Sequence, residues 1–174
     1  MTVEIIRLHE AFGAEVRGID LSKPLDADDF GTVHQAHLTY GIVLFRDQHL
    51  TPDQHKAFSL RFGPAEIHVV SWYRLPGHPE LIVVSNKKSA DGKPLGLEDA
   101  GRYWHSDMSY LRTPALGSVL LAHEVPPTGG DTMFASMRAA FDALPEARKE
   151  ELLKMRAIHH FGSRWYREKD KTGI

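Results

Sequence analysis

The chain contains no cysteine among its 174 residues, which excludes a disulfide framework, a thiolate zinc site and a cysteine nucleophile. It also lacks an excess of one charge: with a formal net charge of -2, nothing indicates binding to nucleic acid or to an anionic membrane. No apolar run approaches the length needed to span a bilayer. The first 18 residues carry acidic side chains early, so we expect no signal peptide and a cytoplasmic protein.

Histidine is the unusually frequent residue type, with 11 histidines against 5 tyrosines and 3 tryptophans. Imidazoles bind metals and transfer protons near neutral pH, so this count weakly favours metal or proton chemistry. Hydrophobic residues make up 42% and charged residues 25%, as in ordinary globular proteins. The length suits one domain, and we expect a single domain over residues 1–174.

The N-terminal part predicts two short strands at residues 4–8 and 14–21, with a turn at Gly13. Asp26 has the character of a helix N-cap, and Gly41 is expected to end that helix. The apolar run 41–45 is short and β-branched, which favours a buried strand. One face of the predicted helix carries Phe30, Val33, His34, His37 and Leu38.

A second helix has a clear start signal. Thr51 is the expected cap, Pro52 takes the first helical position, and Gln54 completes a capping box. We expect this helix to end after Phe62, before a Gly-Pro pair.

The rest of the chain predicts more strands than helices. A turn is expected at 74–80, a long polar loop at 86–101, and helices after the cap Ser136 and from Pro145. The order of elements predicts a mixed domain with a largely antiparallel sheet. We expect strands at residues 66–70, 81–85, 117–125 and 155–161.

The stretch GRYWHSDMSYLRTP (101–114) places His105 and Asp107 two positions apart. On a strand, side chains two apart point to the same face, so the pair can supply two adjacent metal ligands. With one more histidine it would form the facial triad of non-haem iron oxygenases. Trp104 and Tyr110 are expected to pack around the pair and stiffen it.

The pair alone is weak evidence, because 11 histidines and 23 acidic residues give about one or two His-x-Asp/Glu pairs by chance. A second pair, His78 and Glu80, lies in a Pro- and Gly-rich turn, and we interpret it as a solvated loop. For His105 and Asp107, a hydrogen bond between two side chains at a strand end stays open as the simpler interpretation.

Longer stretches resemble a known family. Residues 103–144 contain WHSD, a Thr-Pro turn, an apolar segment, PTGGDT and a capped helix, in that order. Residues 41–63 add GIVLFRDQHLTPDQHKAFSLRFG, and residues 13–25 add GAEVRGIDLSKPL. Together these motifs resemble the taurine/alpha-ketoglutarate (TauD/TfdA-like) dioxygenase family, which depends on Fe(II) and 2-oxoglutarate.

The resemblance implies roles for four residues. His105 and Asp107 would be two of the Fe(II) ligands, and Thr132 would bind a carboxylate of the co-substrate 2-oxoglutarate. His68 would face the primary substrate, a small organic acid such as a sulfonate or an aryloxyacetate. Without the resemblance, Thr132 would be interpreted as the start of a strand and His68 as a core histidine. The implied reaction hydroxylates this acid with O2 and converts 2-oxoglutarate to succinate.

The resemblance also implies a fold: a double-stranded β-helix, or cupin-like jelly roll, of mixed α+β and mainly β character, with helices packed outside. In this family, the third ligand and an arginine for 2-oxoglutarate lie far downstream. We therefore expect the 174 residues to be the N-terminal part of an incomplete domain, and activity of the chain alone is in doubt. Homo-oligomers are common in the family. The charged segment 164–174 is interpreted as the entrance to a lid.

Two alternatives stay open. The chain could be a non-catalytic family member that keeps the fold without a complete triad. A zinc hydrolase is disfavoured, because no glutamate adjoins the pair as in an H-E-x-x-H helix. The remaining histidines, His123, His159 and His160, are not assigned as ligands.

Overall fold

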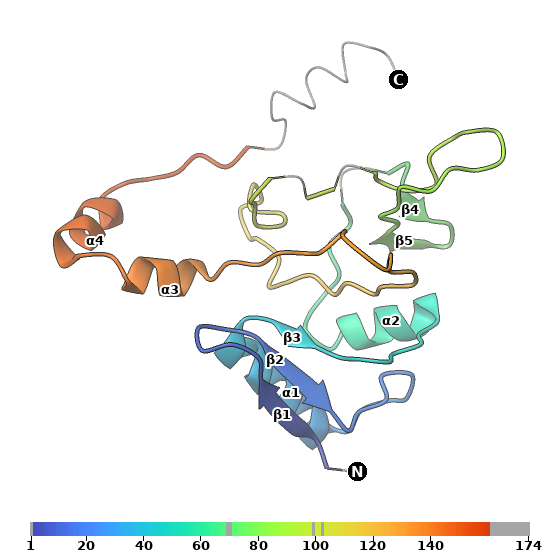
Figure 1. The fold of residues 1–174 in the computed structure, drawn as a ribbon, viewed down its shortest axis with the longest axis horizontal. Coiled ribbons are helices and arrows are strands. Elements are labelled where there is room, and N and C mark those ends of the chain that lie inside the picture. The colour runs from blue at the N-terminus through green and yellow to red at the C-terminus, as the bar shows by residue number, and fades with distance from the viewer. Residues whose placement is uncertain (1, 69–70, 99, 102, 161–174) are drawn as a thin grey trace. The chain divides into compact units, whose positions relative to one another are not determined.

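The computed structural model describes residues 2–68, 71–98, 100–101 and 103–160 (Figure 1). The chain divides into two compact units. The first unit comprises Met1–Ala100 and Val119–Ala143, and the second comprises Gly101–Ser118 and Leu144–Ile174. The segment 164–174, interpreted above as a lid entrance, lies outside the described residues.

Two antiparallel strands open the first unit, β1 (Glu4–Arg7) and β2 (Ala14–Arg17). Their register places Ile5 opposite Val16, so β-branched side chains pair across the ladder. Gly13 turns the chain between them with φ 89°, a left-handed value that glycine adopts without steric cost. Both strands and their turn follow the sequence prediction, although β2 is shorter than expected.

A third strand, β3 (Val43–Leu44), pairs in parallel with β2 and gives the order β1-β2-β3 (Figure 1). The prediction of a largely antiparallel sheet is wrong for this strand. Parallel neighbours need a crossover connection, and the long helix between β2 and β3 supplies it. The predicted strand 41–45 is thus present but shorter.

Glu15 on β2 is a buried carboxylate with two arginine partners. Its Oε1 lies 2.5 Å from Arg17 Nε and its Oε2 lies 3.2 Å from Arg46 Nε. The Arg17 guanidinium in particular holds the pKa of Glu15 below its usual value. Because a buried charge is tolerated only when paired, these contacts tie β2 to the segment that follows β3.

Helix α1 (Ala27–Tyr40) begins where the sequence predicts, and the carboxylate of Asp26 caps its first turn. It ends at Gly41, as expected. The helix contacts β2 and β3 and lies on one side of the sheet (Figure 1). Val33, on the predicted apolar face, is fully buried, whereas Leu38 is 51% exposed.

Helix α2 (Pro52–Ser59) contains the predicted capping box. The Thr51 hydroxyl accepts from the Gln54 backbone N–H at 3.3 Å, and the Gln54 amide oxygen accepts from the Thr51 N–H at 2.8 Å. The helix ends at Ser59 rather than Phe62, because the backbone after Ser59 tightens into bonds three residues apart, such as Phe62 N to Ser59 O at 3.1 Å.

The hydrophobic core of the first unit joins α1 and α2 to the sheet. Its fully packed centre consists of Val16, Leu21, Val33 and Phe58. The Phe58 ring meets Phe45 and Phe62 edge-on, with centroids 5.6 and 5.5 Å apart. Partly buried residues complete the core: Val3, Ile5, Ile19, Leu25, Val43, Phe45, Leu50 and Phe62.

The predicted turn at 74–80 is itself a hairpin of β4 (Arg74–Leu75) and β5 (His78–Ile82). The Pro-Gly pair at 76–77 supplies the tight connection, and Gly77 has φ 82°. The strands therefore lie inside the segment that composition marks as a turn, and β5 overlaps only the start of the predicted strand 81–85.

Three other predicted strands are not formed in the described part of the chain. Residues 66–68, 117–125 and 155–160 belong to no strand, while 69–70 and 161 lie outside the described residues. A strand needs a hydrogen-bonded neighbour, and no described residue pairs with these segments.

The polar loop predicted at 86–101 has internal structure. An isolated antiparallel bridge joins Lys88 and Pro94, so part of the loop folds back on itself. Gly96 approaches the neighbouring backbone so closely that an added Cβ would lie 2.7 Å from Val83 O. The glycine is therefore required by a close approach of two chain segments.

Two short helices follow. Helix α3 (Met137–Asp142) lies in the first unit, and the Ser136 hydroxyl accepts from its backbone as predicted. Helix α4 (Glu146–Leu153) begins after Pro145 in the second unit. Neither helix buries a residue, and none of the described helices is long and apolar enough to cross a membrane.

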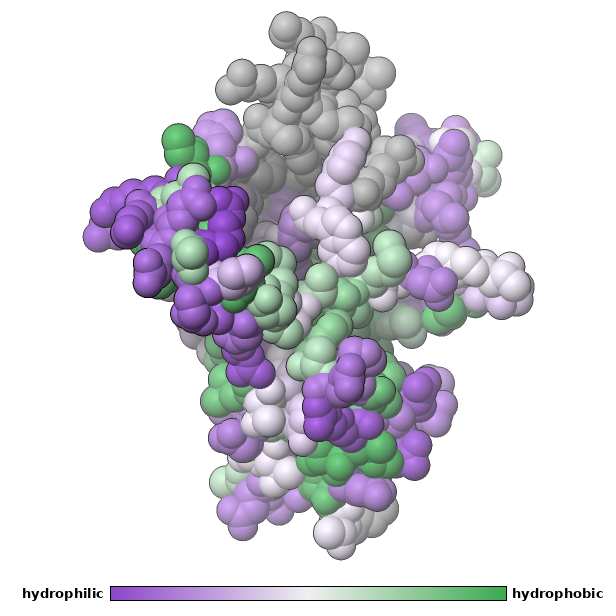
Figure 2. Space-filling view, turned by 60° about the vertical axis from the view of Figure 1, so that its left-hand side comes forward, coloured by the Kyte–Doolittle hydropathy of each residue, from purple (hydrophilic) through white to green (hydrophobic). Residues whose placement is uncertain are grey.

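The described residues thus form a mixed α and β structure, as predicted, with two small sheets. Apolar residues also reach the surface, visible among the polar ones in Figure 2. The most exposed of them include Leu120, Val125, Met133, Met137, Leu153 and Ile158.

Candidate metal centre

His105 and Asp107 converge in the second unit. His105 Nε2 lies 3.1 Å from Asp107 Oδ1. The other ring nitrogen, Nδ1, lies 2.7 Å from the Tyr103 carbonyl oxygen, and the other carboxylate oxygen, Oδ2, accepts from the Ser118 hydroxyl at 2.6 Å. The imidazole and the carboxylate therefore point toward each other, and each is oriented by a further partner.

The backbone that carries the pair is not the predicted strand. The chain is irregular through His105 and turns from Asp107 to Tyr110, with Met108 at φ 53° and a 3.0 Å bond from Leu111 N to Met108 O. No described strand lies beside this segment to hold it in a sheet. The convergence of the two side chains comes from this turn instead of a strand face.

The hydrogen-bond pattern restricts the protonation of His105. A backbone carbonyl only accepts, so Nδ1 must carry the hydrogen that it donates to Tyr103. In a neutral ring, the lone pair of Nε2 then faces the lone pairs of Asp107 Oδ1. Two such acceptors attract each other only through a proton or a cation between them. The 3.1 Å contact fits either the hydrogen bond between two side chains that the sequence left open or a metal ion between the two atoms.

The donor set fits a divalent metal ion. First-row metals bind histidine nitrogen and carboxylate oxygen at about 2.1 Å, so two ligands at right angles lie about 3.0 Å apart. The observed separation of His105 Nε2 and Asp107 Oδ1 is 3.1 Å. Imidazole and carboxylate also suit ferrous iron, and no thiolate competes because the chain lacks cysteine.

The pair offers two candidate ligands. Among the described residues, no group of three or more His, Cys, Asp or Glu could hold a metal ion. The other histidines considered above, His123, His159 and His160, therefore join no such group. A third protein ligand would have to come from outside the described arrangement.

The surroundings of the pair are open. The side chains of His105 and Asp107 are 53% and 55% exposed. Trp104 is 69% exposed, so the prediction that it packs around the pair is wrong, because no described strand covers this segment. Tyr110 is half-buried, and its hydroxyl lies 3.3 Å from Met108 Sδ.

The two other predicted site residues, Thr132 and His68, belong to the first unit. Thr132 is exposed and follows Gly129 and Gly130, which both have left-handed φ values; it does not begin a strand. His68 is half-buried, and its carbonyl oxygen accepts from Arg74 Nη2 at 2.6 Å. The structure brings His105 and Asp107 together, and the roles of Thr132 and His68 stay predictions.

The sequence analysis interprets the pair His78 and Glu80 as part of a solvated loop, and this interpretation is wrong. His78 and Glu80 lie on β5 and are partly buried. Lys56 on α2 lies 2.5 Å from Glu80 Oε1 and holds the pKa of Glu80 below its usual value. His78 Nδ1 lies 3.7 Å from Asp53 Oδ1. These contacts connect the β4–β5 hairpin to α2, so His78 and Glu80 have a structural role.

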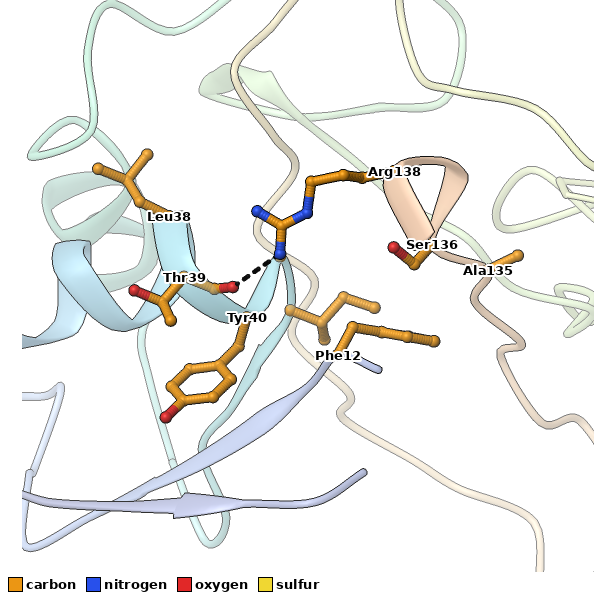
Figure 3. Close-up of a pocket in the computed structure, with 9 residues that line it drawn as sticks. Phe12, Leu38, Thr39, Tyr40, Ala135, Ser136 and Arg138 are labelled. Carbon is orange, nitrogen blue, oxygen red and sulfur yellow. Dashed lines mark hydrogen bonds between the residues drawn. The ribbon is translucent and has the colours of Figure 1, made fainter. Parts of the chain in front are cut away.

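A cavity of about 300 Å³ lies in the first unit near the end of α1 and the start of α3 (Figure 3). Apolar side chains of Phe12, Leu38 and Ile42 line it. Arg138 reaches toward α1, where its Nη2 lies 3.4 Å from Thr39 O, the dashed line in Figure 3. None of the predicted site residues lines this cavity.

A histidine nitrogen and a carboxylate oxygen that face each other at 3.1 Å form a candidate mononuclear metal site. The family model "Taurine catabolism dioxygenase TauD, TfdA family" matches residues 4–173. The chain belongs to this family, and the family prediction is confirmed.

Curated relatives agree. The chain is 37% identical over 170 residues to the alpha-ketoglutarate-dependent 2,4-dichlorophenoxyacetate dioxygenase of Cupriavidus pinatubonensis, a match covering 92% of this chain and 59% of the relative. It is 37% identical over 166 residues to the (S)-phenoxypropionate/alpha-ketoglutarate-dioxygenase of Sphingobium herbicidovorans, covering 92% and 55%. The chain thus spans little more than half the length of these relatives.

Solved structures of dioxygenases also resemble this chain over about half of their length. A taurine dioxygenase from Burkholderia xenovorans matches with a TM-score of 0.78 at 30% identity, over 92% of this chain and 54% of that one. AAD-2 in complex with Mn(II) and N-oxalylglycine matches with a TM-score of 0.64 at 33% identity, over 88% and 51%.

Proposed function

We propose that this chain is part of an Fe(II)- and 2-oxoglutarate-dependent dioxygenase that hydroxylates a small organic acid. The observation that carries the proposal is the His105–Asp107 pair, whose facing atoms are 3.1 Å apart in a chain of the TauD/TfdA family. The ring hydrogen fixed on Nδ1 by Tyr103 leaves Nε2 available as a ligand atom.

The proposed roles follow the family pattern. His105 and Asp107 hold the iron, Thr132 binds a carboxylate of 2-oxoglutarate, and His68 faces the organic acid. Bound iron would supply O2 activation, coupled to decarboxylation of 2-oxoglutarate to succinate and to insertion of oxygen into a substrate C–H bond. The contribution of the protein is to orient the donor atoms and the substrate.

For the substrate, we propose an aryloxyalkanoate as the first class to test. The two relatives at 37% identity are named for 2,4-dichlorophenoxyacetate and (S)-phenoxypropionate. Relatives named for a sulfate ester and a sulfonate are 28% identical, so those acids form the second class.

For the fold, we propose that the whole protein forms the predicted double-stranded β-helix around the metal. The likeness to complete dioxygenase structures over about half their length supports this. In such a fold, the unpaired segment 117–125 would gain strand neighbours, and the open surroundings of the pair would be covered.

The test is a binding experiment on the protein produced from its gene. Anaerobic addition of Fe(II) and 2-oxoglutarate should give a weak visible charge-transfer band that His105→Ala abolishes. His123→Ala, which removes an exposed histidine outside the pair, should leave the band intact. A band of equal strength in His105→Ala and the unsubstituted protein would contradict the assignment.

A non-catalytic family member is the second candidate, favoured by the lack of a three-ligand group among the described residues. Release of succinate during incubation with 2-oxoglutarate, Fe(II), O2 and a panel of aryloxyalkanoates and sulfonates separates the two. The dioxygenase proposal predicts release with at least one acid, whereas the non-catalytic candidate predicts none.

A further inference from the structure

The two oxygens of Asp107 have different partners within the second unit. Oδ1 faces His105 Nε2 at 3.1 Å. In the proposed function, a metal ion would bind to these two atoms. Oδ2 accepts a 2.6 Å hydrogen bond from the hydroxyl of Ser118, which lies 11 residues further along the chain. The carboxylate is therefore held from both sides, although the chain turns between Asp107 and Ser118.

We propose that Ser118 is a positioning residue for Asp107: its hydroxyl occupies Oδ2 and keeps Oδ1 directed at the metal. The inference rests on the proposed function, because it assumes that Asp107 is a ligand. Beyond the proposed function, the inference states that the Ser118 hydroxyl restricts Asp107 to binding the metal through Oδ1 and fixes the orientation of its carboxylate.

The physical reason is the freedom of an aspartate side chain. Its terminal torsion is broad, so a carboxylate on an exposed turn rotates easily unless a hydrogen bond fixes it. A hydroxyl bonded to an ionised carboxylate makes a short, strong contact of about 2.5–2.7 Å, which the Ser118 bond matches. Partners that orient a ligand in this way typically change metal affinity by about 10–100-fold when removed.

A simpler explanation is that the bond only stabilises the turn. In that case, its loss would change the stability of the metal-free protein and leave metal affinity alone. The two explanations differ in what the hydroxyl does once metal is present, so the test must separate the hydroxyl from the shape of the side chain.

The experiment measures Mn(II) affinity from the electron paramagnetic resonance signal of free Mn(II), using the protein produced from its gene. Threonine keeps the hydroxyl and valine has nearly the same shape without it. We expect Ser118→Thr to bind within about threefold of the unsubstituted protein and Ser118→Val to bind about 10–100-fold more weakly. Ser106→Ala removes a neighbouring exposed hydroxyl and should have no effect.

The outcomes separate the two proposals. Equal Mn(II) affinity in Ser118→Thr and Ser118→Val, with binding still abolished by His105→Ala, would overturn the role of Ser118 and leave the metal site standing. Absence of Mn(II) binding in the unsubstituted protein, or binding unaffected by His105→Ala, would overturn both. Thermal unfolding of each metal-free variant checks that the threonine and valine forms are equally folded.

Discussion

Replacing Phe58 with alanine tests whether the core of the first unit is built around α2. Phe58 is only 7% exposed, and its ring meets Phe45 and Phe62 edge-on at 5.6 and 5.5 Å. A phenylalanine buries about 150–250 Å², which at about 25 cal/mol per Å² gives an upper bound of about 4–6 kcal/mol. Measured Phe-to-Ala changes in cores cost about 3–5 kcal/mol, and we predict about 4 kcal/mol.

Urea unfolding followed by circular dichroism measures this loss as a change in the free energy of unfolding. Phe58→Leu keeps most of the apolar volume and loses the two ring contacts, so about 1–2 kcal/mol is expected. Phe134→Ala is the matched control, because Phe134 is 54% exposed and its loss should cost less than about 1 kcal/mol. If Phe58→Ala costs no more than this control, the proposed core is wrong.

Three further perturbations test local features of the fold. Thr51→Ala should cost about 1 kcal/mol by removing the α2 cap, with Thr51→Ser near the unsubstituted value in the same urea assay. Gly96→Ala should cost about 1–3 kcal/mol, because its Cβ would lie 2.7 Å from a backbone oxygen; Gly31→Ala on α1, with nothing within 4 Å, should not destabilise. The ion pair with Lys56 lowers the pKa of Glu80, so its stabilisation is present above the ordinary value of 4.5 and is lost as the pH falls through the lowered value. The stability gap between Glu80→Gln and the unsubstituted protein should therefore narrow on acidification, and a constant gap would contradict this account.

Local signals in the sequence predicted the features that depend on a few neighbouring residues. The caps of α1 and α2 were predicted correctly, because Asp26 and Thr51 satisfy backbone groups only three residues away. The sequence also predicts that His105 and Asp107 converge, but it does so from a common strand face, whereas a turn from Asp107 to Tyr110 brings them together.

Strand placement failed where it depends on distant partners. The segment 117–125 is largely apolar, yet no described strand pairs with it, and composition alone cannot supply a neighbouring strand. The hairpin β4–β5 is absent from the prediction because the whole segment 74–80 is interpreted as a turn, whereas only Pro76 and Gly77 connect the two strands.

The contacts that orient the candidate site could not be predicted. Ser118 bonds to Asp107, which lies 11 residues earlier in the chain. The backbone between them has a positive φ at Met108, and a methionine gives no sign of such a turn in the sequence. Arg74 likewise bonds the carbonyl oxygen of His68, six residues before it. No residue type or spacing in the sequence marks either contact.

The most direct test of the central claim is an anomalous-scattering map from crystals of the protein grown with Mn(II). We predict a metal peak within bonding distance of both His105 Nε2 and Asp107 Oδ1, with Ser118 still bonded to Oδ2. A protein whose Mn(II) binds elsewhere, while His105 and Asp107 remain joined directly to each other, would contradict it.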